Sequence, residues 1–148
     1  MELEKAQHVA ERLIEMYCRD YTFAFDNAVR RFGSCNLHKK VITLSRSLVL
    51  LNNVTDVKQT ILHEIAHAIT REKHTKNWLQ VARSIGYNGG RLYGKHVITP
   101  PKRYTYKCEC CSRLVECHRR KDRTACGVCC KKYNNGKWSG NYLLKEIK

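Results

Sequence analysis

Residues 60–78 have the sequence TILHEIAHAITREKHTKNW, and the interpretation of the whole chain starts from this segment. At about 100° of rotation per residue, an α-helix gathers its isoleucines and leucine on one face. The opposite face carries His63 and His67, one turn apart, with Glu64 beside them. The spacing predicts an amphipathic helix from about Asp56 to Arg71, with one face in a core and two imidazoles on the other.

The histidine pair is suited to a metal ion. Side chains at positions i and i+4 have Cβ atoms about 5–6 Å apart, so two imidazole nitrogens can bind one Zn²⁺. This H-E-x-x-H arrangement is typical of zinc peptidases, in which the glutamate is the general base. We therefore interpret His63 and His67 as ligands of a catalytic zinc and Glu64 as the catalytic residue. The alternative is an amphipathic helix whose solvated face happens to hold two histidines.

A catalytic zinc takes three protein ligands and keeps one position open for water or substrate. The downstream candidates for the third ligand are Glu72, His74 and His96. We prefer His74, because it falls in a tight turn before a second helix that Thr75 can cap and Gly86 can end. The alternative for His74 is an exposed loop histidine.

Together these residues resemble the signature of the SprT-like (Spartan-type) metalloprotease domain. The resemblance rests on the H-E-x-x-H motif, on His74 and on Trp78 four residues later. Segments 31–36 (RFGSCN) and 40–45 (KVITLS) and a four-cysteine ribbon downstream are also similar to that family. One departure is the short connection before His74, which lacks the glycines often seen there.

The resemblance implies a small zincin-like metalloprotease domain that cleaves proteins stalled or crosslinked on DNA. Zinc would polarise the scissile carbonyl, while Glu64 moves a proton from water to the leaving amine. Zincin-type sites commonly bind extended substrate on an edge strand, and the resemblance makes the segment from Val41 to Leu44 the candidate. The glycine-rich segment 87–96 is expected to be a loop that can cover the cleft. Its candidates for stabilising a tetrahedral oxyanion, among which spacing does not choose, are Arg91, Tyr93 and His96.

Other segments predict the elements around the active-site helix. Residues 3–18 have apolar positions at helical spacing and predict an amphipathic helix packed on the core. Residues 21–25 and 40–45 alternate or are β-branched, which predicts two strands, and Gly33 between them marks a turn or bulge. Ser45 can cap a short helix after the second strand. The predicted fold class is α+β, with helices packed on a short sheet.

The chain has 148 residues, which suits one compact domain with a small metal-stabilised module. The paired prolines in Thr99–Lys102 predict a linker, so we expect a metalloprotease domain over 1–99 and a zinc ribbon over 100–148. No segment approaches the ~18 apolar residues of a membrane span, and the N-terminus lacks the features of a signal peptide. We expect a cytoplasmic monomer without a membrane partner, associated with the nucleoid or, in a eukaryote, located in the nucleus.

Seven of the nine cysteines lie between Cys108 and Cys130, which indicates zinc ligation in a reducing compartment rather than disulfides. Two C-x-x-C pairs, Cys108 with Cys111 and Cys126 with Cys129, can bring four thiolates to one closed tetrahedral zinc site. A module this short buries little apolar surface, so metal binding and folding should be coupled. The residues that could substitute as ligands, or be spare, are Cys110, Cys117, Cys130 and His118. The lone Cys35 is interpreted as a core thiol rather than a nucleophile.

Positive charge is concentrated in the last third of the chain. The net charge is +15, and residues 100–148 hold 13 Lys and Arg against 4 Asp and Glu. A basic surface predicts an anionic partner, and DNA that is single-stranded or has single-stranded character is the leading candidate. Tyr104, Tyr106, Tyr133 and Trp138 are candidates to stack on unpaired bases. The predicted nucleic-acid-binding residues are Arg113, Arg119, Arg120, Lys121, Arg123, Lys131 and Lys132.

These features predict a zinc-dependent endopeptidase with one catalytic and one structural zinc, guided by the ribbon to DNA-associated protein substrates. One alternative is a nucleic-acid-binding zinc protein whose H-E-x-x-H site is residual or not proteolytic. Another is an amide hydrolase of different specificity whose basic tail binds an acidic protein or RNA. Loss of function on Glu64→Gln would favour a hydrolase, and stimulation by DNA would favour the DNA-guided protease.

Overall fold

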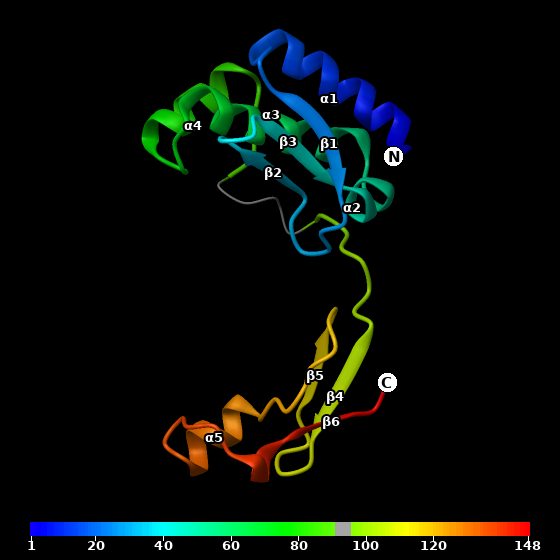
Figure 1. Cartoon of the computed structure of the whole chain (residues 1–148), viewed down its shortest axis with the longest axis vertical. Helices are drawn as coiled ribbons and strands as arrows, with labels where there is room; N and C mark the ends of the chain where they lie inside the picture. The colour runs from blue at the N-terminus through cyan, green and yellow to red at the C-terminus, as the bar shows by residue number, and fades with distance from the viewer. Residues whose placement is uncertain (91–95) are drawn as a thin grey trace. The chain divides into compact units, whose positions relative to one another are not determined.

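The structure is a computed structural model that describes residues 1–90 and 96–148. It divides into two compact units, Met1–Pro100 and Pro101–Lys148, each with its own small sheet and helices (Figure 1). The fold class is α+β, as the sequence predicts. Within the described part of the chain, every helix is too short or too polar to cross a membrane.

The first unit contains a three-stranded sheet in the order β1-β3-β2. Strand β1 (Thr22–Asp26) is parallel to β3 (Val41–Ser45), and β2 (Gly33–Asn36) is antiparallel to β3. Two of our expectations for this sheet are wrong. Gly33 begins a strand rather than a turn, and the Val41–Leu44 segment is the central strand, with both of its edges paired inside the sheet.

Among its described residues, this unit has four helices: α1 (Leu3–Tyr17), α2 (Arg46–Leu51), α3 (Val54–Thr70) and α4 (Lys76–Ser84). Side-chain caps fix where three of them begin. Ser45 accepts a hydrogen bond from a first-turn backbone N–H of α2, Asn53 does the same for α3, and Thr75 for α4. Each cap satisfies a donor that the helix itself leaves unpaired.

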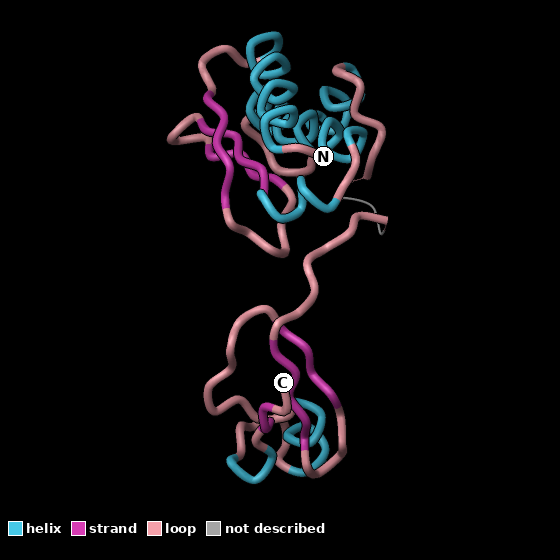
Figure 2. The backbone as a smooth tube through the Cα atoms, turned by 90° about the vertical axis from the view of Figure 1, so that its right-hand side faces the viewer, coloured by secondary structure: helices cyan, strands magenta, loops and turns pink. Residues whose placement is uncertain are grey.

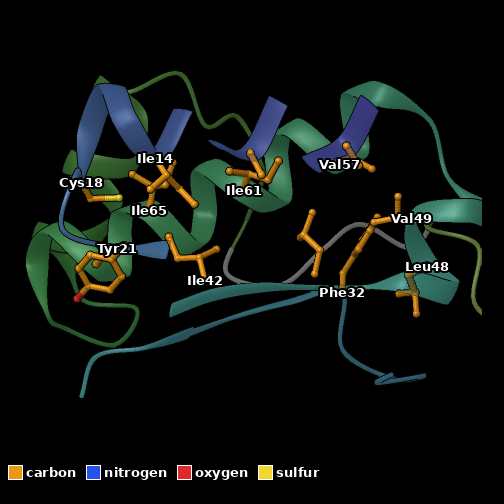
Figure 3. Close-up of a cluster of buried hydrophobic side chains, with 14 residues drawn as sticks. Ile14, Cys18, Tyr21, Phe32, Ile42, Leu48, Val49, Val57, Ile61 and Ile65 are labelled. Atoms are coloured by element: carbon orange, nitrogen blue, oxygen red, sulfur yellow. The ribbon is translucent and has the colours of Figure 1, made fainter. Parts of the chain in front are cut away.

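The core lies between α1, α3 and one face of the sheet. Figure 3 shows Ile14 of α1, Ile61 and Ile65 of α3 and Ile42 of β3 in one cluster. Phe32, which comes just before β2, is completely buried in the same cluster. Burial of this apolar face turns the histidine-bearing side of α3 away from the core, as the helical periodicity predicts.

The second unit is built around its cysteines. Strands β4 (Tyr104–Cys108), β5 (Leu114–Cys117) and β6 (Leu144–Glu146) form an antiparallel sheet in the order β5-β4-β6. The helix α5 (Gly127–Tyr133) and a 3₁₀ turn, Gly140–Tyr142, lie between β5 and β6 in the chain. Figure 2 shows that long loops, drawn in pink, connect the strands and helical turns of this unit. The buried cluster consists of Cys108, Cys126 and Cys129, with Tyr142 and Leu144 packed against them.

Candidate metal centres

Three imidazoles converge on one point in the first unit. His63 and His67 project from successive turns of α3, and His74 faces them from the turn before α4. The Nε2 atoms are 3.3 Å apart between His63 and His67, 3.2 Å between His67 and His74, and 2.9 Å between His63 and His74. A tetrahedral zinc with bonds of about 2.0–2.1 Å needs nitrogens about 3.3 Å apart. The cluster therefore fits a zinc ion with little rearrangement.

The tight turn that brings His74 back depends on Arg71. This residue is the C-cap of α3 and adopts the left-handed conformation (φ 56°, ψ 23°), and its N–H donates to the carbonyl of His67 at 2.9 Å. Glycine is the usual residue at such a position, because it has no Cβ to clash. The connection thus makes the turn with an arginine where the sequence offers no glycine.

Glu72 supports the metal centre through its backbone rather than as a ligand. Its carbonyl oxygen accepts a hydrogen bond from Nδ1 of His67 at 2.7 Å, which leaves Nε2 of that ring free for a metal. Its carboxylate accepts hydrogen bonds from the Thr75 hydroxyl and, at 3.2 Å, from the Asn77 amide. The carboxylate is therefore used to hold the start of α4.

The electrostatics of the histidine cluster favour neutral rings. Burial, together with the neighbouring His67 and His74, lowers the pKa of His63 to about 3. Burial also lowers the pKa of His67. Only a neutral imidazole has a nitrogen lone pair for a metal, so these shifts suit a ligand cluster.

Glu64 lies next to this cluster, on the buried side of the helix. Its side chain is 8% exposed, and burial raises its pKa to about 7, against the opposing charge of Arg31. The side chain packs directly on the backbone of β2. A Cβ atom at Gly33 would lie 2.8 Å from Thr60 Cγ2 and 3.0 Å from Glu64 Cγ. Only glycine lets the strand approach the carboxylate so closely.

A cleft of about 780 Å³ opens over the imidazoles and Glu64. Strand β2 lines it through Gly33, Ser34 and Cys35. Within the described residues β2 pairs with β3 alone, so one of its edges is free. The edge strand beside the metal centre is therefore β2. The other sides of the cleft are lined by α3, the Arg71–His74 turn, Tyr87–Gly89, His96 and Val97.

The remaining candidates from the sequence lie elsewhere. His96 lines the cleft, but its Nε2 is 2.7 Å from the carboxylate of Asp56, and it is not part of the imidazole cluster. Arg91 and Tyr93 fall outside the described residues. Cys35 packs against the core, and burial raises the pKa of its thiol to about 12, which disfavours the nucleophilic thiolate.

Sequence reasoning overlooked two aromatic side chains at the site. Tyr87 is almost fully buried, and its ring lies 5.2 Å from that of His63. Trp78, which carried part of the family resemblance, contacts all three imidazoles. In the sequence, Trp78 was used only as part of the family resemblance, and no local pattern singled out Tyr87.

The second unit brings four thiols together. Sγ of Cys108 lies 3.7 Å from that of Cys129, and Sγ of Cys111 lies 3.8 Å from that of Cys126. All four sulfurs are within 4.8 Å of one another. With Zn–S bonds of about 2.3 Å, a tetrahedral site needs sulfurs about 3.8 Å apart, so the cluster fits zinc. The backbone N–H of Cys129, with that of Val128, lowers the pKa of the Cys126 thiol to about 7.

The spare thiols of the ribbon are not members of this four-sulfur cluster, although Cys110 interacts with Cys129. Cys110 is exposed, Cys130 is buried in α5, and the Cys117 thiol donates to the carbonyl of Arg119 at 3.0 Å. None of these thiols belongs to the four-sulfur group that the described residues form. The C-x-x-C pairs that the sequence singled out are the ones that converge.

Most of the basic residues named for nucleic-acid binding are at the surface. Lys121 is half-buried, and Arg120 is paired with Glu146 at 2.9 Å and lies over the Tyr104 ring. Arg120 is nevertheless exposed, as are the other five: Arg113, Arg119, Arg123, Lys131 and Lys132.

The aromatic residues of the ribbon divide into exposed and buried ones. Tyr133 and Trp138 are more than half exposed, whereas Tyr106 is 2% exposed. The Tyr106 hydroxyl accepts a hydrogen bond from the N–H of Lys121 at 2.8 Å. The prediction that Tyr106 is available to stack on bases is therefore wrong, and Tyr133 and Trp138 have the accessible rings.

Three imidazoles beside a buried glutamate are the arrangement of a metallopeptidase-type site. The model of the SprT-like family matches residues 6–99, so this chain belongs to the SprT-like family. Among solved structures, the crystal structure of the metallopeptidase zymogen of Pyrococcus abyssi abylysin is similar at 16% identity and a TM-score of 0.47. That match covers 61% of this chain and 84% of the other. No curated protein sequence matches the chain.

Proposed function

We propose that the first unit is a zinc-dependent endopeptidase whose ligands are His63, His67 and His74. The observation that carries the proposal is the convergence of three Nε2 atoms within 2.9–3.3 Å, beside a buried glutamate at the base of a cleft. Membership of the SprT-like family supports a metalloprotease-type function.

The residues of the cleft divide the chemistry between them. A zinc ion, when bound, supplies a Lewis acid that polarises the scissile carbonyl and lowers the pKa of water. Glu64 takes a proton from the attacking water and delivers it to the leaving amine. The charge of Arg31 favours the ionised carboxylate that this first step needs. Glu72 holds His67 in the tautomer that presents Nε2.

The substrate is proposed to be an extended polypeptide that pairs with β2. The free edge of this strand lines the cleft, and its Gly33 contacts the Glu64 side chain. A peptide added to that edge obtains main-chain hydrogen bonds irrespective of its sequence. Such binding suits a protease that acts on many different proteins.

The ribbon is proposed to bring the protease to DNA-associated proteins, including stalled or crosslinked ones. Support comes from its exposed lysines and arginines and from the exposed rings of Tyr133 and Trp138. Phosphate contacts by the cations do not depend on sequence, and stacking requires unpaired bases. We therefore propose DNA with single-stranded character as the partner, and a second, structural zinc in the four-thiolate site.

The test is a cleavage assay on the full chain with a DNA-bound protein as substrate. Wild type should cleave it faster with single-stranded DNA present, and Glu64→Gln should lose at least about 10²-fold of the activity, because the general base contributes about 10²–10⁴-fold. Cys35→Ala is the matched control for a cleft residue without a catalytic role. Cleavage that persists in Glu64→Gln would refute the peptidase mechanism. An equal rate of cleavage with and without single-stranded DNA would refute the guiding role of the ribbon.

A further inference from the structure

One indole contacts all the imidazoles of the metal centre, and this arrangement suggests more than core packing. The Trp78 ring is stacked on that of His67, with centroids 5.1 Å apart and planes at 26°. It meets the His63 ring at 4.7 Å and 64°, and the His74 ring at 4.6 Å and 80°. The three ligands come from α3 and from the turn before α4, so the indole is a common surface for rings from two parts of the chain.

The indole itself is held firmly. Trp78 is completely buried, in a cluster with Leu62, Ala66, Ala82 and Tyr87. It lies in the first turn of α4, where its backbone N–H donates to the Thr75 hydroxyl at 3.1 Å. The cap that starts the helix therefore also fixes the position of the tryptophan relative to His74.

The imidazoles need such a surface because the torsion that rotates a histidine ring is soft. For His67 the hydrogen bond to Glu72 limits this rotation. The His63 ring has no such acceptor within the described residues, where its hydrogen-bond partners are the other two imidazoles. Among the described residues, its other ring neighbours are Trp78 and Tyr87, so packing against these two rings can define its orientation.

The presence of tryptophan at position 78 also supports a role in orienting the imidazoles. Its Nε1–H is buried without a hydrogen-bond partner in the described part of the chain. Leaving a buried donor unpaired is unfavourable, and phenylalanine would avoid that penalty. A phenyl ring, however, is smaller than an indole and offers less surface to three imidazoles. The larger ring therefore provides more contact, although its Nε1–H has no partner among the described residues.

We propose that Trp78 is a positioning residue that arranges the three imidazoles for the metal before the metal binds. The proposal rests on the proposed function of the first unit, because it concerns the same zinc site. Outer residues that orient metal ligands typically change metal affinity 10–100-fold when they are replaced.

The experiment compares Trp78→Leu and Trp78→Phe with Leu62→Ala in the full chain. Leu62 is in the same buried cluster as Trp78 but does not line the cleft, so its truncation controls for lost packing. The first measurement is zinc affinity of the histidine site by competition with a chelator, with His63→Ala defining that site. The second is NMR of the imidazole nitrogens after the chelator has emptied it.

Trp78→Leu should bind zinc 10–100-fold more weakly than wild type. Its imidazole NMR signals without metal should be averaged by ring rotation. Trp78→Phe should lie between wild type and Trp78→Leu in both measurements. Leu62→Ala should keep the affinity and the fixed tautomers of wild type. The proposal would be overturned if Trp78→Leu and Trp78→Phe matched Leu62→Ala in zinc affinity and in imidazole signals. Should Trp78→Leu fail to fold, the result for Trp78→Phe is used instead. If wild type binds no more zinc than His63→Ala, the proposed function fails, while the metal-free imidazole signals still decide the role of Trp78.

Discussion

At the scale of single residues, Gly33 controls the distance between the edge strand and Glu64, the proposed general base. In Gly33→Ala the added methyl group would lie 2.8 Å from Thr60 Cγ2 and 3.2 Å from Glu64 Oε1, so the carboxylate or the strand must move. A displacement of about 1 Å can cost about 10²-fold in rate, and overpacking costs about 1–3 kcal/mol of stability. We expect kcat/KM to fall at least about tenfold in a protein that still folds.

The matched control for this substitution is Gly90→Ala, whose added Cβ would meet nothing within 4 Å. Both variants should be compared by kcat/KM, zinc content and chemical unfolding. A folded, zinc-loaded Gly33→Ala protein with the activity of Gly90→Ala would contradict the role assigned to Gly33.

Arg71 is the second residue whose backbone sets the geometry of the site. A non-glycine residue in the left-handed region costs about 1 kcal/mol or more. Arg71→Gly should therefore be more stable than Arg71→Ala by about 1 kcal/mol, since both variants lack the arginine side chain and differ only at Cβ. Urea unfolding followed by Trp78 fluorescence in a Trp138→Phe background measures the difference. Equal stability of the two variants would show that the turn carries no such strain.

At the scale of secondary-structure elements, short sequence patterns predicted the helices and their caps, because interactions between neighbouring residues determine both. The 3.6-residue period of α3, its histidine pair and the caps at Ser45 and Thr75 all follow from short stretches of sequence. The strand order does not, because pairing joins segments that are far apart in the chain. Strand β2 was missed, since Gly33 is a poor strand former and its place in the sheet depends on contact with α3.

The same limit applies to the residues around the metal centres. The C-x-x-C spacing predicts which cysteines act as pairs, whereas the approach of Cys108 to Cys129 and of Cys111 to Cys126 depends on the fold of the unit. The contacts of Tyr87 with His63 and of Glu72 with His67 depend on how the loops fold back, which no spacing reveals. Burial of Tyr106 likewise follows from the pairing of β4 with two neighbours.

The elements of the ribbon should depend on metal. The buried cluster of this unit is three cysteines with Tyr142 and Leu144 at their edge, which is a small apolar core. Removal of zinc from the four-thiolate site should unfold β4–β6 and α5 and leave the first unit folded. Hydrogen exchange with and without a strong chelator measures this directly.

Two cysteine variants separate metal loss from other effects of the treatment. Cys126→Ser should reproduce the loss of amide protection, whereas Cys117→Ser should retain it, because the Cys117 thiol is outside the four-sulfur cluster. Protected ribbon amides in the zinc-free protein would show that the module folds without metal.

At the scale of the whole molecule, a net charge of +15 makes any DNA binding strongly dependent on salt. Lys131→Glu with Lys132→Glu should weaken binding to single-stranded DNA and reduce the slope of log affinity against log salt. Trp138→Ala should lower affinity by about 1–3 kcal/mol with little change in that slope, since stacking is not ionic. Titrations by fluorescence anisotropy at several salt concentrations provide both quantities.

The control for charge is the equal reversal Lys5→Glu with Arg12→Glu, at exposed positions of α1 in the first unit. It changes the net charge as much as the reversal in the ribbon. If both double variants weaken DNA binding equally, the ribbon has no special role, and only the overall charge matters.

We propose that one chain holds a three-histidine zinc site and a four-thiolate zinc site. The most direct measurement is anomalous diffraction from crystals of the full chain above and below the zinc absorption edge. We predict two peaks, one at about 2.0–2.1 Å from the Nε2 atoms of His63, His67 and His74, and one at about 2.3 Å from the four cysteine sulfurs. A single peak at the cysteines, with no density between the imidazoles in zinc-supplemented crystals, would contradict the claim.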